Sequence, residues 1–230
     1  MFSVIILAGG TGSRMNQSVP KQFLALAGKP MILHTLERME RIDEVGEIIV
    51  ACHPQYKELL EMHIAAYMLK KPYQIVDGGA TRQQSAYLGV KVAKYEDIII
   101  HEAARPFVTT QEFKALMSSD AECATYGIDI PFTVSLRSGD VIDGLLERDK
   151  LVNIQLPQKF KRNTLLAAYE QAEKDGMTFT EDTSLLYHYT HTPVKVLLGS
   201  PNNVKITSSV DLITGETIYR EYINREGLRE

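Results

Sequence analysis

The chain has 230 residues, of which 44% are hydrophobic and 23% are charged, and its formal net charge is −4. This length suits one α/β domain with a substantial buried core, and the composition is that of a soluble globular protein. The negative net charge argues against a general binder of nucleic acid or anionic membranes, because both need a basic face. A local basic pocket is still compatible with it.

Cys52 and Cys123 are the only cysteines, and no disulfide framework or CxxC metal pair can be written from them. We expect both to be buried thiols of a reducing compartment. No basic leader precedes the strand-like residues 4–7, and no apolar run is long enough to span a bilayer. The sequence therefore predicts a cytoplasmic protein that binds neither membrane nor nucleic acid.

The first strand-like run ends abruptly in small residues, AGGTGSRM over 8–15. Glycine lets backbone N–H groups approach a phosphate where a Cβ would clash, and Arg14 and Lys21 are the cations that can complete such a cradle. A P-loop is excluded because Ser13 and Arg14 follow Gly12 where that motif has a lysine and then a serine or threonine. The dinucleotide pattern G-x-G-x-x-G also fails, because Met15 occupies its third glycine position.

Strand-like and helix-like segments then alternate. The spacing predicts helices over 29–41, 54–68 and 81–92, and strands over 47–51, 74–76 and 97–100. This alternation implies a parallel sheet with right-handed crossovers. Thr109 and Glu112 have capping-box spacing and predict a helix to about Ser119.

Two further turns follow predicted strands. The turn DGGA over 77–80 leads into a helix whose first turns carry Arg82 and Ser85, where free N–H groups and the helix dipole attract anions. A plain tight loop is the alternative there. Glu102 and Arg105 follow the strand at 97–100, where ligands of open α/β sheets bind. Glu102 is thus a candidate Mg²⁺ ligand, and a simple salt bridge to Arg105 is the alternative.

The pattern changes at 127–131. Residues 132–153 are strand-like around a turn at 138–140, and they predict a β-hairpin arm that projects from the sheet. Because a two-stranded arm needs a partner to cover it, we predict a homodimer joined through this arm. Beyond the arm, the sequence predicts helices over 161–174, from 180 and over 208–223, and strands over 194–198 and 202–207.

Seven segments, in order, resemble a known family: LAGGTGSRM, PKQF, DGGATRQQS, HEAARP, LPQ-F, TEDTS and NVKIT. The chain is similar to the cytidylyltransferases typified by 2-C-methyl-D-erythritol 4-phosphate cytidylyltransferase of the non-mevalonate isoprenoid pathway, and to the related ribitol 5-phosphate enzymes. The resemblance implies a single nucleotidyltransferase domain over 1–230. Its expected fold is α/β, a Rossmann-like, mostly parallel sheet flanked by helices, with a β-arm at about 132–155 that completes the partner's active site.

The same resemblance implies roles for individual residues. Arg14 and Lys21 match the family's catalytic cations, and Glu102 its metal ligand. The nucleotide-binding positions are Ala8, Gly9, Gly10, Gly12, Gly79, Ser85, Ala103 and Arg105, and the acceptor-binding positions are Ser135, Arg148, Thr180 and Lys205. CTP is the implied co-substrate and Mg²⁺ the implied cofactor, and Arg148 reaches across the dimer. The implied reaction is in-line attack of an acceptor phosphate oxygen on the α-phosphorus of CTP.

Some residues depart from the family pattern. Glu102 stands for the usual aspartate, Leu156 for the threonine of the T-P-Q segment and Thr81 for an acidic residue, while Ser135 in place of threonine is a milder change. The resemblance makes methylerythritol phosphate the leading acceptor. Because the loss of a hydroxyl near the acceptor can change the substrate, ribitol 5-phosphate and a phosphonate or phosphorylated amino alcohol are alternatives. More distant hypotheses are a nucleotide-sugar pyrophosphorylase that uses another nucleoside triphosphate, a dehydrogenase and a non-catalytic binding module.

Overall fold

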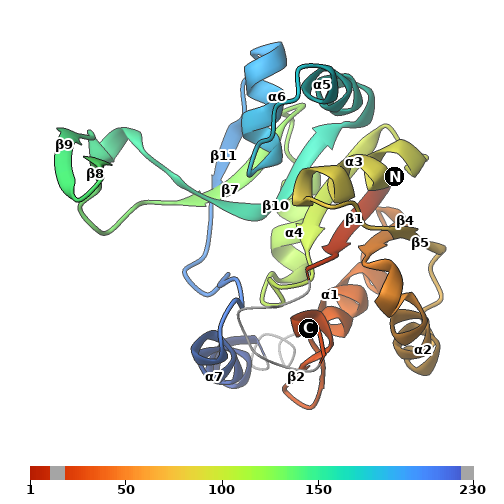
Figure 1. Cartoon of the computed structure of the whole chain (residues 1–230). Helices are drawn as coiled ribbons and strands as arrows, with labels where there is room; N and C mark the ends of the chain where they lie inside the picture. Colours follow the sequence, from red (N-terminus) through yellow and green to blue (C-terminus); the bar gives the residue numbers. More distant parts are fainter. Residues whose placement is uncertain (11–18, 224–230) are drawn as a thin grey trace.

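A seven-stranded sheet forms the centre of the molecule in the computed structural model, which describes residues 1–10 and 19–223 (Figure 1). The strands are, in spatial order, β11 (Lys195–Leu198), β7 (Ala124–Ile128), β10 (Asn153–Lys161), β6 (Asp97–Glu102), β1 (Phe2–Ala8), β4 (Val45–Cys52) and β5 (Tyr73–Asp77). Only β10 runs antiparallel to its neighbours, and the other neighbouring strands are parallel. The predicted mostly parallel α/β sheet is confirmed.

Helices cover both faces of the sheet. One face carries α1 (Met31–Glu40), α2 (Lys57–Tyr67) and α4 (Thr110–Met117), and the other carries α3 (Arg82–Val92), α5 (Arg162–Lys174) and α6 (Asp182–Thr190). Short 3₁₀ helices, η2 (Lys21–Phe23) and η3 (Pro54–Tyr56), precede the β2–β3 pair (Ala25–Leu26, Lys29–Pro30) and α2. The last helix, α7 (Ser209–Ile218), continues into a π-helical turn, η5 (Tyr219–Ile223), and packs on the β2–β3 pair.

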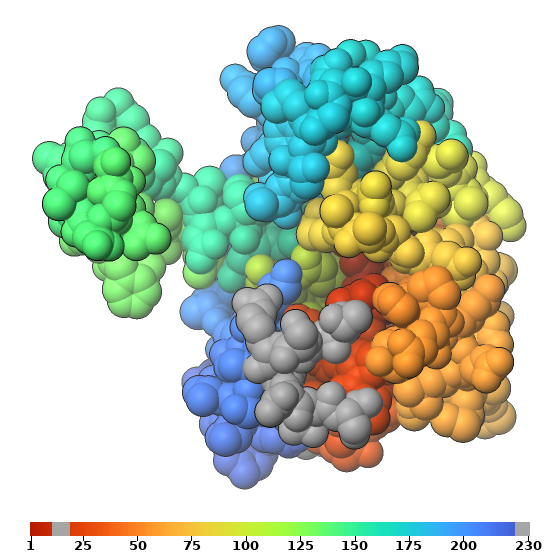
Figure 2. Space-filling model, in the orientation of Figure 1, coloured from red at the N-terminus to blue at the C-terminus, as the bar shows by residue number. Residues whose placement is uncertain are grey.

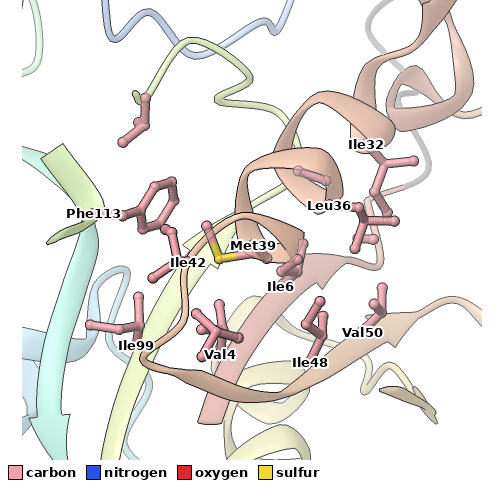
Figure 3. Close-up of a cluster of buried hydrophobic side chains, with 14 of the residues drawn as sticks. Val4, Ile6, Ile32, Leu36, Met39, Ile42, Ile48, Val50, Ile99 and Phe113 are labelled. Carbon is pink, nitrogen blue, oxygen red and sulfur yellow. The ribbon is translucent and has the colours of Figure 1, made fainter. Parts of the chain in front are cut away.

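The two-sided core follows from the β1 sequence. Successive side chains of a strand point to opposite faces, so Val4 and Ile6 join one cluster while Ile5 and Leu7 join the other. Figure 3 shows the first cluster, where Val4 and Ile6 lie beneath side chains of α1, among them Leu36. Each fully buried side chain of this size contributes roughly 1.5–3 kcal/mol to folding.

Side chains cap the N-terminal ends of helices α4, α6 and α7, that of α4 as predicted. Thr109 Oγ1 accepts the Glu112 N–H at 3.1 Å, and the Glu112 carboxylate accepts the Thr109 N–H at 2.7 Å, which is the predicted capping box. Glu181 caps α6, and Ser208 caps α7. Within the described ranges no helix is long and apolar enough to cross a membrane.

Three parts of the sequence prediction were wrong. No strand was predicted at Ala124–Ile128, and residues 157–160, expected only to lead into a helix, lie in β10. Pro157 fits in this strand because the register of β10 on β7 shifts between Gln155 and Gln158. The predicted strand over 202–207 is irregular backbone, tied to the 103–106 turn by the Ile206 N–H, which donates to the Ala104 carbonyl at 2.8 Å.

The predicted hairpin arm is present. Strands β8 (Ser135–Ser138) and β9 (Val141–Leu145) pair only with each other, and the hairpin stands clear of the body (Figures 1 and 2). A short 3₁₀ helix, η4 (Arg148–Lys150), follows on the return to β10. The arm exposes large apolar side chains, namely Phe132, Leu136, Val141, Ile142 and Leu145.

Candidate active site

A pocket of about 710 Å³ opens where four parallel strands end. Gly9 follows β1, His53 follows β4, Gly78 follows β5, and Glu102 is the last residue of β6. Ligands of open α/β sheets bind at this edge. The described lining residues are Leu7, Gly9, Gly10, Lys21, His53, Pro54, Gly78, Gly79, Ala80, Thr81, Arg82, Ser85, Glu102, Ala104 and Lys205.

The second glycine turn is held against the start of α3. The Gly79 N–H donates to Ser85 Oγ at 3.1 Å, and that hydroxyl donates to the Thr81 carbonyl at 2.9 Å. A side chain on Gly79 would collide with Cβ of Gln84, so only glycine fits here. Thr81 caps α3 by accepting the Gln84 N–H. The first turn of α3, with its positive dipole end, thus lies beside the pocket and favours an anion there.

Three cations from separate parts of the chain reach this pocket. Lys21 comes from η2, Arg82 from α3 and Lys205 from the irregular segment before α7. Lys21 Nζ donates to the Ile206 carbonyl at 3.1 Å, which places it next to the Lys205 segment. With one carboxylate, that of Glu102, the described wall carries two net positive charges although the whole chain carries −4. This arrangement suits a polyanionic ligand.

Glu102 lies at the centre of the cation cluster and is almost fully buried. Its Oε1 accepts from Arg82 Nε at 3.0 Å, and its Oε2 lies 2.7 Å from Lys205 Nζ. The salt bridge to Arg105 that the sequence suggested is the longest of the three, at 3.9 Å. Burial alone would raise the pKa of Glu102, but Lys205 and Arg82 outweigh burial and lower the pKa to about 2. The carboxylate is therefore ionised at neutral pH.

The structure brings several of the predicted catalytic, nucleotide-binding, acceptor-binding and metal-binding residues together. Those on the pocket wall are Gly9, Gly10, Lys21, Gly79, Ser85, Glu102 and Lys205. Ala8 and Ala103 are buried at the ends of β1 and β6. Arg105 Nη1 donates to the Asn203 carbonyl at 2.8 Å, so Arg105 anchors the segment that carries Lys205 instead of lining the pocket. Gly12 and Arg14 lie outside the described residues.

The predicted acceptor residues other than Lys205 are not on the pocket wall of the described chain. Ser135 and Arg148 belong to the arm, and Thr180 is exposed just before α6. Leu156, the departure expected to affect the acceptor, is buried in the cluster on the α3 face. Its side chain therefore packs in the core, and its backbone carbonyl accepts from Asn203 Nδ2 at 2.7 Å.

Sequence reasoning missed two residues behind the pocket wall. The TEDTS segment predicted a helix start, and Glu181 is indeed the cap, but the next residue, Asp182, is buried and binds Arg82 with both carboxylate oxygens. Tyr169 of α5 donates to Asp182 from behind. The one available signal was a second acidic residue beside the cap, and its partner is 100 positions away in the chain.

A glycine-rich, cation-lined pocket at the strand ends of a Rossmann-like sheet suits a nucleotide, as a nucleotidyltransferase requires. Residues 2–221 match the family described as "IspD: 2-C-methyl-D-erythritol 4-phosphate cytidylyltransferase". The chain belongs to this family and is a cytidylyltransferase. The resemblance inferred from the seven sequence segments is confirmed.

Named relatives agree with this assignment over nearly the whole chain. The 2-C-methyl-D-erythritol 4-phosphate cytidylyltransferase of Clostridium botulinum is 37% identical over 222 residues, which cover 94% of this chain and 96% of the relative. The enzyme of that name from Geobacillus kaustophilus is 33% identical, again covering 94% and 96%. The crystal structure of 4-diphosphocytidyl-2C-methyl-D-erythritol synthase from Anaerococcus prevotii superimposes with a TM-score of 0.84 at 26% identity, covering 96% of each chain.

Proposed function

We propose that this chain transfers CMP from CTP to 2-C-methyl-D-erythritol 4-phosphate and releases pyrophosphate, a step of isoprenoid biosynthesis. The observation that carries the proposal is the cluster of Lys21, Arg82 and Lys205 around the strand-end pocket, in a chain that belongs to a cytidylyltransferase family. The triphosphate would lie against these cations and the first turn of α3. The Gly78–Gly79 turn and Ser85 would contact the nucleoside.

The chemistry needs charge neutralisation more than proton transfer. A phosphomonoester has its second pKa near 6, so the acceptor phosphate is already an anionic nucleophile at pH 7. One of its oxygens forms a bond to the α-phosphorus of CTP while the bond from that phosphorus to the bridging oxygen of the β-phosphate breaks, and pyrophosphate leaves with the electron pair. Lys21, Arg82 and Lys205 would stabilise the charge that builds on these oxygens.

Mg²⁺ is part of the proposal, and the pocket fits it as an ion that arrives with the triphosphate. Glu102 is the one carboxylate on the described wall, and no group of three acidic, histidine or cysteine residues that could hold a metal occurs in the described ranges. One carboxylate together with substrate phosphates is a common Mg²⁺ ligand set. When bound, the ion would share the negative charge of the triphosphate, with Glu102 as its ligand from this chain.

Pyrophosphate release from CTP tests the proposal. Purified protein would be assayed with Mg²⁺, CTP and one acceptor at a time from a panel of 2-C-methyl-D-erythritol 4-phosphate, ribitol 5-phosphate, 2-aminoethylphosphonate and phosphocholine. We expect turnover with methylerythritol phosphate alone. A response to another acceptor would replace the proposed substrate, and turnover only with UTP, GTP or ATP would replace the nucleotide.

The role of the pocket cations is tested by a pair of lysine variants. Lys205→Met removes the charge that lies 2.7 Å from Glu102, and we expect kcat/KM to fall on the order of 10²-fold. Lys195→Met is the matched control, because Lys195, the first residue of β11, forms an exposed ion pair with Asp120. Equal rates for the two variants would contradict the assignment.

We also propose a homodimer joined through the arm. A hairpin of two strands is marginal alone in water, and this one exposes a row of apolar side chains, with Leu145 86% exposed. Analytical ultracentrifugation should give a dimer for the wild type and a monomer for Leu145→Asp. Ile213→Asp, at an exposed apolar position of α7, should stay dimeric. A monomeric wild type would contradict the proposal.

Arg148 and Ser135 lie on this arm, so we propose that they and Thr180 serve the acceptor, Arg148 and Ser135 in the partner's site. Subunit mixing tests this for Arg148. Dimers of Arg148→Met and dimers of Lys205→Met would each be nearly inactive, but a mixed dimer holds one intact site. Mixing should therefore restore activity toward about a quarter of the wild-type value, and no recovery would place Arg148 in its own subunit's site.

We place the reaction in the cytoplasm. Cys52 and Cys123 are both buried and unpaired, as expected for a reducing compartment. Burial raises the pKa of Cys52 to about 11 and that of Cys123 to about 12, so both remain thiols. Cell fractionation should recover the activity with a cytosolic marker enzyme.

A further inference from the structure

A buried carboxylate and a buried phenol stand behind the pocket wall, outside the set of residues given a role above. Asp182 is the first residue of α6 and is only 1% exposed. Its Oδ1 accepts from Arg82 Nη1 at 2.9 Å, and its Oδ2 accepts from Arg82 Nη2 at 2.8 Å. A buried carboxylate is costly unless it is paired and fully hydrogen-bonded, and this fork supplies the pairing.

Tyr169 completes the shell of Asp182. Its hydroxyl donates to Asp182 Oδ1 at 2.6 Å from the fully buried face of α5. Burial, reinforced by Asp182, raises the pKa of Tyr169 well above its usual value, so the phenol stays protonated and remains a donor. Asp182 is thereby held between α5 and α6 and presents both oxygens to α3.

Arg82 is the point where this buried pair meets the pocket. Its side chain is 24% exposed and lines the pocket, whereas both of its carboxylate partners are buried. The three hydrogen bonds to Glu102 and Asp182 use three of the five N–H groups of a guanidinium. Two carboxylates on different elements therefore fix the plane of the guanidinium, and one N–H on each of Nη1 and Nη2 is left without a partner among the described residues.

We propose that Asp182 and Tyr169 are positioning residues of the transfer reaction, which hold the Arg82 guanidinium in the orientation that binds the triphosphate. The inference rests on the proposed function. Orientation matters here because Asp182 takes the Nη1–Nη2 fork and Glu102 takes the Nε–H, so each of the two remaining N–H groups reaches a phosphate oxygen only when the guanidinium plane is fixed. A flexible side chain fixed in this way also loses no further rotamer freedom when the nucleotide binds.

A pair of tyrosine variants gives the gentlest test. Tyr169→Phe removes only the hydroxyl that touches Asp182. Tyr189→Phe is its matched control, because the Tyr189 hydroxyl also donates to an aspartate, Asp175, at 3.0 Å, but away from Arg82. We expect kcat/KM for CTP to fall about 10-fold in Tyr169→Phe and to stay at the wild-type value in Tyr189→Phe, in line with losses seen when the outer partners of a site are removed. Equal values for the two variants overturn the proposal.

A double-mutant cycle separates positioning from a merely structural role. Asp182→Asn and Arg82→Gln should each lower kcat/KM about 100-fold, and the double variant should be no worse than Arg82→Gln alone, because Asp182 acts through Arg82. Losses that multiply would show that Asp182 acts independently of Arg82 and would overturn the proposal. Should Asp182→Asn fail to fold, the tyrosine pair decides.

Binding of inorganic triphosphate, measured by titration calorimetry without acceptor, separates the failure of this inference from the failure of the proposed function. If the wild type shows no turnover with any combination of nucleotide and acceptor from the panel, the proposed function is rejected. Weaker triphosphate binding in Tyr169→Phe than in Tyr189→Phe would still support the positioning role. Equal binding would reject it.

Discussion

His34 offers a quantitative test of how the segment that carries Lys21 is held. The imidazole is buried in α1, and its Nε2 donates to the carbonyl of Leu26 at 2.8 Å, in the β2 strand that follows Lys21. Burial lowers the pKa of His34 to about 4, with a further decrease from Lys29 and an opposing contribution from the bond to Leu26. The folded chain thus binds this proton less readily than the unfolded chain does.

The sign of the pH effect follows from this difference. Between pH 6.5 and 4 the unfolded state is protonated at this site and the folded state is not, so stability is complete above pH 6.5 and falls as the pH is lowered through this window. With a pKa of about 4 in the folded state and 6.5 in the unfolded state, the loss from pH 7.5 to pH 5 is about 2 kcal/mol. For a chain of this size that corresponds to a decrease in Tm of roughly 4–8 °C.

His34→Gln isolates this contribution, because an amide can still donate to Leu26 but does not titrate. Urea unfolding at pH 7.5 and pH 5 should show that the variant loses about 2 kcal/mol less stability than the wild type between the two pH values. His188→Gln replaces an exposed imidazole on α6 and should keep the wild-type dependence. The same pH dependence in His34→Gln and the wild type would refute the reasoning, whatever the absolute stability of the variant.

Other predictions concern the pocket and the core. Ser85→Ala removes the acceptor of the Gly79 N–H and should raise KM for CTP about 10-fold with little change in Tm; an unchanged KM would remove Ser85 from the site. Gly89→Ala places a Cβ 2.5 Å from Ile5 Cγ2 and should destabilise the protein by about 1–3 kcal/mol in urea, and neutral behaviour would show that α3 can shift. EDTA should abolish turnover. Calorimetry should detect Mg²⁺ binding only when CTP is present, because the Glu102 carboxylate is already paired with Arg82 and Lys205 in the free protein. Tight Mg²⁺ binding to the free protein would contradict this.

Much of the fold was predictable because local signals agree with the tertiary structure in the first part of the chain. The β-branched runs of β1 and β6, the cap Thr109 and the glycine turn at 78–79 all lie where the sequence placed them. Each of these features depends on neighbours within a few residues. A single sequence carries that kind of information directly.

The second half of strand β10 was not predicted, because several of its buried residues are polar and give no apolar pattern. Gln158 and Lys159 are buried and satisfied by distant groups: the Gln158 side chain bonds to Thr125 and Glu181, and Lys159 Nζ donates to the Ser119 carbonyl at 2.6 Å. Such partners turn polar side chains into core residues. The pattern of the strand alone, which also contains a proline, gives no hint of them.

The site was predictable in its parts but not in its connections. Gly79, Ser85, Lys21 and Lys205 could be assigned from motifs, because each stands at a turn or segment with a recognisable pattern. That Glu102 joins cations from three segments depends on strand order and on the loop before α7, which only the folded chain reveals.

The two carboxylates that bind Arg82 have different consequences for the reaction. Asp182 is enclosed and pairs, within the described residues, with Arg82 as its only cation, so this ion pair is fixed. Glu102 also forms an ion pair with Lys205. The Lys205 side chain is 38% exposed and flexible enough to exchange this carboxylate for a phosphate. The site therefore combines one rigid cation with one that can change partners. An incoming triphosphate can take Lys205 from Glu102 while Arg82 stays in place, and this exchange would free a carboxylate oxygen for the proposed Mg²⁺.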